Sequence, residues 1–160
     1  MSYRNRTIWG VNCGKRGDTL FLDNNHIGIG WGEIGNLEDL GFEQKKFISA
    51  VEENFPDLDH VNVPVIAGHL YRFLHEANKG DLVVYLSEKD LLVHIGEIVG
   101  GYEYHPETDC GYPHQREVKW LKESRIQKFS NSTIYAIESP MSFFRMQDYT
   151  GEYAKILESD

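Results

Sequence analysis

Residues 82–100, LVVYLSEKDLLVHIGEIVG, decide the fold. Two runs rich in β-branched and aromatic residues, 82–87 and 91–100, flank a polar turn at residues 88–90. Two such runs joined by a short polar turn predict an antiparallel β-hairpin. We therefore expect a sheet that is built outward from this hairpin.

Four other short runs are β-prone and extend the expected sheet. The second of them contains Gly28 and Gly30, and glycines inside a strand often mark a bulge or a close approach of another group to the backbone. If the first two strands pair, Trp9 and Trp31 come to lie near each other. The four runs are residues 7–12, 26–31, 117–121 and 133–137.

Apolar residues at helical spacing predict two helices, at 43–55 and from 62 to about 77. Pro56 ends the first, and Pro64 suits the first turn of the second. A helix or turn region is expected after Pro140. Helices and strands are segregated along the chain, which indicates the α+β class and not a parallel βαβ sheet.

Length and composition favour one globular domain, residues 1–160. The chain is 41% hydrophobic and 26% charged, as in ordinary globular domains. No apolar run reaches the roughly 18 residues of a membrane helix, and no secretory signal is recognised. The two cysteines cannot form a disulfide framework, so we expect a cytoplasmic protein without a membrane partner. The last residues are compatible with this domain being the N-terminal part of a longer protein.

The net charge of −9 disfavours binding to nucleic acid by bulk electrostatics. Basic residues nevertheless dominate residues 114–128. We expect four of them to form one rim that contacts phosphates, because such contacts position a nucleic acid without reading its sequence. They are Arg116, Lys119, Lys122 and Arg125.

Metal sites have weak support in the sequence. His105, Cys110 and His114 are the best zinc candidates. A structural zinc site wants four ligands, usually with a paired cysteine spacing that is absent here. A polar loop between strands is the better interpretation, and we expect no metal and no cofactor.

Catalytic signals are also weak, so we expect a protein that is not an enzyme. Asp109, Glu117 and Lys119 superficially match a metal-dependent nuclease, in which carboxylates hold the metal and a lysine assists. Asp109, however, falls in a loop flanked by proline and glycine. Cys13 has no base near it in the sequence and is better explained as a small buried residue at a strand end.

Aromatic and polar side chains gather at the ends of the expected strands. Strand aromatics usually belong to the core. At strand ends beside polar groups they can instead wall a pocket in which a flat ring stacks and its edge is hydrogen-bonded. The residues of this candidate pocket are Trp9, Asn12, Trp31, Tyr85, Ser87 and Tyr104.

The same stretches resemble a known family. Residues 80–87 (GDLVVYLS), 93–99 (VHIGEIV) and 102–106 (YEYHP) are similar to the EVE branch of the PUA-like superfamily. Residues 8–12 and 112–121, with the strand expected at 26–31, are similar to the N-terminal DNA-reading domains of McrB-type modification-dependent restriction systems. The resemblance spans roughly residues 8–137. Leu86 stands where a histidine is usual, and the Trp-Asp-Gly-Val-Arg-Asn stretch of the EVE pattern is missing.

The resemblance implies a curved β-barrel of about five or six strands, flanked by two or three helices. It also implies recognition of a modified base, flipped or single-stranded, in an aromatic cage. Carried over by position, Trp9 and Trp31 would be cage walls, and Tyr85 or Tyr104 a further wall. The edge-reading groups would be Asn12 and Ser87.

The function expected from this resemblance is a DNA specificity module of a restriction or defence system that acts for an effector nuclease or motor domain. Related YTH and SRA domains read methylated adenine in RNA and methylated cytosine in DNA. Three alternatives stay open: a PUA-like module that reads tRNA or modified adenine in RNA, the metal-dependent nuclease, and a sensor of small nucleobases or nucleotides.

Overall fold

A six-stranded sheet forms the centre of the protein in a computed structural model that describes residues 3–13, 18–148 and 150–159. The strand order is β2-β5-β4-β3-β1-β6. β1 runs parallel to β3, and all other neighbours are antiparallel. The strands are β1 (Ile8–Val11), β2 (His26–Ile29), β3 (Leu82–Leu86), β4 (Leu92–Tyr104), β5 (His114–Arg125) and β6 (Phe143–Met146).

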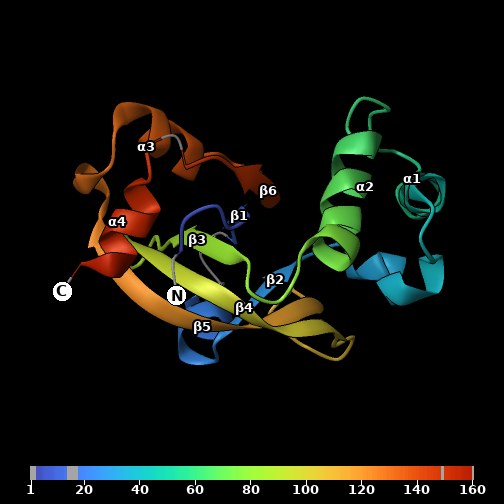
Figure 1. The fold of residues 1–160 in the computed structure, drawn as a ribbon. Coiled ribbons are helices and arrows are strands. Elements are labelled where there is room, and N and C mark those ends of the chain that lie inside the picture. Colours follow the sequence, from blue (N-terminus) through green and yellow to red (C-terminus); the bar gives the residue numbers. More distant parts are fainter. Residues whose placement is uncertain (1–2, 14–17, 149, 160) are drawn as a thin grey trace.

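The sheet is strongly curled, in the form of a half-barrel (Figure 1). The long β4–β5 ribbon has two register shifts, between Ile95 and Gly96 and between Ile98 and Tyr102. Bulges of this kind bend a strand and increase its twist. The register shifts in the pairing of β4 with β5 therefore account for the curvature of the sheet.

Helices cover both faces of the sheet. None of those in the described ranges is long and apolar enough to cross a membrane. Shorter helical turns lie at Thr19–Asp23, Gly32–Ile34, Leu37–Leu40 and Ile126–Lys128, and Arg72–Glu76 continues α2. The α-helices are α1 (Gln44–Asn54), α2 (Val63–Tyr71), α3 (Asn131–Ile137) and α4 (Glu152–Glu158).

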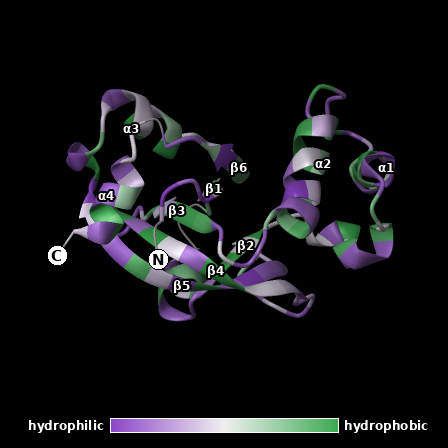
Figure 2. Ribbon diagram, in the orientation of Figure 1, coloured by the Kyte–Doolittle hydropathy of each residue, from purple (hydrophilic) through white to green (hydrophobic). Residues whose placement is uncertain are grey.

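The two faces of β3 belong to two different apolar clusters. Val83 and Tyr85 pack toward α1 and α2, whereas Leu82 and Val84 pack toward α3 and α4. A strand that is covered on both faces has apolar residues at consecutive positions. This explains why β3 is apolar along its length and does not alternate with polar residues. Figure 2 shows hydrophobic colour along β3 and an alternation of hydrophobic and hydrophilic residues along β5.

The sequence prediction is confirmed for the α+β class, the curved sheet, the hairpin and both helices before it. The strand expected at 133–137 is wrong, because these residues lie in α3. Ser130 caps this helix by accepting a hydrogen bond from the Thr133 N–H.

The helix or turn expected after Pro140 is partly wrong, because residues 143–146 form β6. This strand pairs with the edge of β1, which would otherwise be exposed.

The expected pairing of the first two strands is also wrong. β5, β4 and β3 lie between β2 and β1 in the sheet. β1 instead takes β3 and β6 as its neighbours. Trp9 and Trp31 are therefore not brought together by strand pairing.

Gly28 confirms the expected close approach to the backbone of β2, whereas Gly30 does not. A Cβ on Gly28 would lie 2.8 Å from the Tyr112 Cβ and 3.2 Å from the His114 carbonyl oxygen. At Gly30 the nearest atom is the Gly111 carbonyl oxygen, 3.7 Å away.

We expect Gly28→Ala to lower the free energy of unfolding by about 1–3 kcal/mol, because the packed core must shift. Gly30→Ala should change it much less. Urea titrations of the two variants test this pair, and equal midpoints would contradict it.

Candidate functional site

Trp31 follows β2 with only Gly30 between them, and it has an unusual backbone. Its φ of 64° and ψ of 45° place it in the left-handed region, which is a true outlier for a bulky side chain. Gly30 and Gly32 flank it. Strained residues of this kind persist only where the surrounding structure fixes them, and they cluster at functional sites.

His69 fixes the indole ring of Trp31. The two rings are nearly parallel, with centroids 5.7 Å apart and an interplanar angle of 10°. His69 lies on α2 and is buried, and its Nδ1 is 2.8 Å from the Phe143 carbonyl oxygen. Burial lowers the pKa of His69 and outweighs the hydrogen bond to Phe143, which acts in the opposite direction. The ring is therefore neutral at neutral pH, and its Nδ1–H donates to Phe143.

His114 fixes the backbone of Trp31. Its Nε2 lies 3.3 Å from the Trp31 carbonyl oxygen, and its Nδ1 lies 2.7 Å from the Tyr102 hydroxyl. Burial lowers the pKa of His114 against the effect of the hydrogen bond to Trp31. In the neutral ring Nε2–H donates to Trp31, and Nδ1 accepts from Tyr102. Burial also raises the pKa of Tyr102 to about 12, so its hydroxyl keeps the proton that it donates. This hydroxyl in turn accepts the Leu37 N–H at 3.2 Å.

Tyr104 is tied to the same histidine. Its ring stacks on His114 with centroids 5.8 Å apart and an angle of 19°. Tyr104 also lines an open hollow of about 610 Å³ together with Asn24 and Gln115. Trp31 lies outside the lining of this hollow. Of the six side chains predicted to form a pocket, Trp31 and Tyr104 are the two that share one buried positioning residue.

Half-buried Arg72 lies beside His69, and buried Arg116 is the ladder partner of Tyr102. The Arg116 Nη1 donates to the Phe73 carbonyl oxygen at 3.0 Å. The Arg72 Nη2 donates to the Phe143 carbonyl oxygen at 3.3 Å and lies 3.1 Å from the His69 Nδ1. Among the described residues neither Nε has a partner. Burial lowers the pKa of both guanidinium groups.

The predicted phosphate rim does not form as one surface. The phosphate contact predicted for Arg116 is wrong. Arg116 is only 5% exposed because its guanidinium group turns into the core. The Lys122 ammonium group donates to the Ser159 carbonyl oxygen, and to its hydroxyl at 3.0 Å. Lys119 and Arg125 are exposed, and Lys119 stands opposite Glu97 on β4.

Trp9 is a core residue and not an open cage wall. It is 1% exposed, and its ring stacks on Phe143 at 4.8 Å with an angle of 16°. Its indole N–H donates to the Asp81 carboxylate at 2.9 Å. Both its ring faces and its polar atom are thus committed to the fold.

Tyr85, Ser87 and Asn12 are also occupied by internal contacts. Tyr85 and Ser87 are buried, and both hydroxyls donate to the Asp18 carboxylate, Ser87 at 2.7 Å. The Asn12 side-chain amide donates to the Ser139 carbonyl oxygen at 3.2 Å. Cys13 is buried at the end of β1, as expected, and its thiol lies 3.1 Å from the Tyr85 hydroxyl. Ser87 is therefore closed off from an incoming base, whereas Asn12 is partly exposed and lines a separate hollow with Leu86 and Ser139.

The structure also shows where the zinc and nuclease candidates from the sequence lie. His105 binds Glu103 at 2.8 Å, and both nitrogens of His114 are engaged as described above. Asp109 lies in the loop between β4 and β5, whereas Glu117 is exposed on β5 opposite His26.

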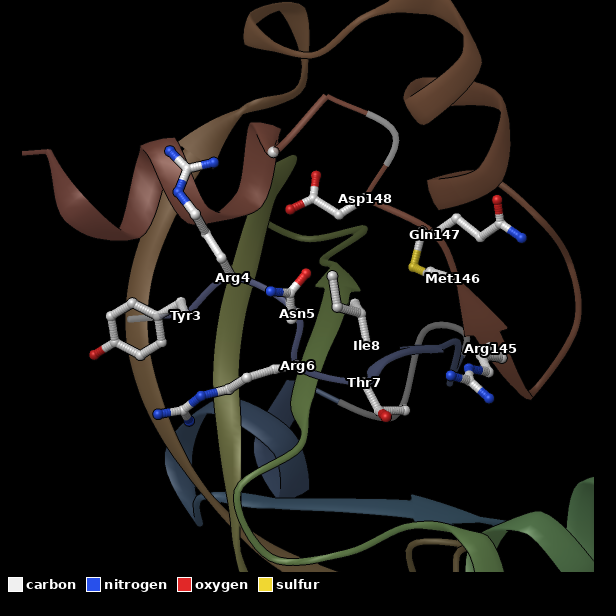
Figure 3. Close-up of a pocket in the computed structure, with 11 residues that line it drawn as sticks. Tyr3, Arg4, Asn5, Arg6, Thr7, Ile8, Arg145, Met146, Gln147 and Asp148 are labelled. Atoms are coloured by element: carbon white, nitrogen blue, oxygen red, sulfur yellow. The ribbon is translucent and has the colours of Figure 1, made fainter. Parts of the chain in front are cut away.

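The hollow in Figure 3 lies between residues 3–8 and the β6 edge and has a volume of about 630 Å³. Arg4, Arg6 and Arg145 line it, but their guanidinium groups point away from one another (Figure 3). Arg6 is bound to Glu97 and to the Gly80 carbonyl oxygen, each at 3.1 Å. The three arginines therefore do not converge on a common anion.

The positioning roles of His69 and His114 were missed in the sequence. His69 falls between Ile66 and Phe73 on the apolar face of the predicted helix. A histidine at a core position of a helix is a signal of a buried polar contact. The sequence offers His114 only as a zinc candidate, because its partner Tyr102 lies on another strand.

Comparison with known protein families assigns the chain to a family. No curated protein matches the chain. Residues 9–142 match the family model described as "Domain of unknown function (DUF8426)". These residues include Trp31, His69, Tyr104 and His114. The match covers most of the chain, and the protein therefore belongs to the DUF8426 family.

Proposed function

We propose that this domain binds nucleic acid and reads a modified base, without cutting the strand, by stacking the base against Trp31. The observation that carries the proposal is the left-handed backbone of Trp31, fixed by one buried histidine on its ring and a second on its carbonyl group. This arrangement holds a flat aromatic surface in one orientation at the end of a sheet strand. Such preorganisation reduces the ordering cost of binding.

The energetics require more than one group. Stacking a base on an aromatic ring contributes about 1–3 kcal/mol. Extruding a base costs a few kcal/mol, and less when the base is mismatched or already single-stranded. Tyr104, whose ring stacks on His114, is our candidate for the second aromatic contact. Exposed Lys119 and Arg125 are candidates for phosphate contacts.

The proposal extends to the fold family and to the biological role. A curled sheet flanked by helices supports a PUA-like, EVE-type assignment (Figure 1). By its similarity to the McrB-type readers we favour DNA over RNA. The domain would then be the specificity module of a restriction or defence system and would direct an effector nuclease or motor domain to modified DNA.

Fluorescence anisotropy with a panel of labelled oligonucleotides tests this function. The panel holds 5-methylcytosine, N6-methyladenine and unmodified sequences, each as duplex DNA, single-stranded DNA and RNA, at low and physiological salt. We expect at least about tenfold tighter binding to one modified DNA than to its unmodified counterpart. Equal affinity for modified and unmodified strands would overturn the base-reading function. Tighter binding to modified RNA would move the assignment to the RNA-reading alternative.

A further inference from the structure

Three potential metal ligands meet near the turn between β3 and β4. Asp90 comes from the turn, His94 from β4 and Glu123 from β5, and one ligand atom from each lies within 4.8 Å of the other two. The His94 Nε2 is 2.8 Å from an Asp90 carboxylate oxygen. The His94 Nδ1 is 3.7 Å from a Glu123 carboxylate oxygen. This group is separate from Trp31 and its two histidines.

The imidazole of His94 is held rigidly. Its side chain is 9% exposed. The ring lies edge-on to Trp120, with centroids 6.1 Å apart, and tilted against Tyr85 at 6.3 Å. His94 and Glu123 are direct partners across the β4–β5 ladder. A ligand placed on a strand and locked by packing is preorganised for binding.

Asp90 is oriented by a second layer of hydrogen bonds. One carboxylate oxygen accepts the Leu92 N–H at 2.8 Å, which leaves the other for His94. The Asp90 N–H donates to the Ser87 hydroxyl at 3.2 Å. Outer partners of this kind are typical of groups that ligate metals.

No lysine or arginine of the described residues forms an ion pair with this group. A neutral imidazole has one N–H, so only one of the two carboxylates that face His94 can receive a proton from it. Among the described residues, Asp90 and Glu123 form no ion pair except those with His94. Two carboxylates around one imidazole leave an excess of negative charge that a second proton or a metal cation would offset. Asp90 faces Nε2 and Glu123 faces Nδ1, but the side chain of Glu123 is 61% exposed and can turn toward an ion that it shares with Asp90.

We propose that Asp90, His94 and Glu123 bind a divalent transition-metal ion such as Zn²⁺. One imidazole nitrogen and two carboxylate oxygens coordinate it at about 2.0–2.2 Å. An imidazole ligand favours Zn²⁺ over Mg²⁺ and Ca²⁺, which prefer sites made of oxygen atoms. Three protein ligands leave further positions to water. The ion bridges the β3–β4 turn to β5, and any proton on the coordinating nitrogen is released when it binds.

Isothermal titration of the metal-free full chain with ZnCl₂, in a buffer that does not bind zinc, tests this site. We expect one Zn²⁺ per chain, and at least about a tenfold loss of affinity in Glu123→Gln and in His94→Gln. Glu117→Gln is the matched control, because it removes an exposed carboxylate from the same strand outside the group. Its affinity for zinc should equal that of the wild type. MgCl₂ should give no comparable binding.

Two results would overturn the metal site. The first is the absence of saturable binding up to about 100 µM Zn²⁺, which would mean that His94 holds only a proton. The second is unchanged affinity in Glu123→Gln, which would place the zinc elsewhere. Because Glu123 is exposed, its variant keeps the test valid even if circular dichroism shows that His94→Gln is unfolded. The outcome is independent of base binding at Trp31, since none of these variants touches that residue.

Discussion

Trp9→Ala should lower the free energy of unfolding by about 3–5 kcal/mol, the usual loss for a large buried aromatic residue. The substitution removes a 1% exposed indole, its stack on Phe143 and its hydrogen bond to Asp81. Its stacking partner Phe143 is itself held edge-on by Phe73, with ring centroids 5.1 Å apart. Phe143 therefore has little freedom to fill the cavity, and urea unfolding followed by intrinsic fluorescence measures the loss.

Trp9→Phe separates packing from the hydrogen bond. Phenylalanine keeps an aromatic ring against Phe143 but loses the indole N–H. Asp81 still accepts the Asn78 N–H at 2.8 Å, so its carboxylate retains a partner. We expect Trp9→Phe to lose much less stability than Trp9→Ala, and to keep the preference among oligonucleotides. If Trp9→Ala is stable but loses the preference among oligonucleotides, Trp9 is a wall of the base-binding cage and not only a core residue.

The parts of the fold that could be predicted are those set by local pattern. The hairpin at 82–100 and the two preceding helices follow from side-chain periodicity, which depends on neighbours in the sequence. Residues 133–137 show the limit of such reasoning. Their β-prone composition predicts a strand, but the Ser130 cap and packing against the sheet make them helical. Tertiary contacts overrule the weak intrinsic preference of a short segment.

The candidate site could be predicted only in part, for the same reason. Trp9 and Trp31 occupy similar places at the ends of short early strands in the sequence. The strand order makes one a core residue between β3 and β6 and leaves the other beyond an edge strand. His69 and Trp31 are brought together by the packing of α2 on the sheet, and periodicity does not specify which residues meet across that interface.

Trp31→Ala should lower the affinity for the preferred modified oligonucleotide by about tenfold or more. The loss of one base–aromatic stack of about 1–3 kcal/mol corresponds to a factor of about five to 150. Weak binding to unmodified strands should persist, because that part depends on phosphate contacts. The variant must first be shown to be folded by circular dichroism and urea unfolding.

Tyr135→Ala is the matched control for Trp31→Ala. It removes an 84% exposed aromatic ring from α3, away from the two histidines. We expect its affinity for modified and unmodified strands to equal that of the wild type. An equal loss in both variants would indicate a general effect of surface aromatics and would remove the special role of Trp31.

The most direct test of the account is the ratio of affinities for the modified and unmodified forms of one DNA sequence, measured in folded Trp31→Ala and in the wild type. If Trp31 is the surface on which the base is read, this ratio falls from about ten or more in the wild type to near one in the variant. A folded Trp31→Ala that discriminates between the two strands as well as the wild type does would contradict it.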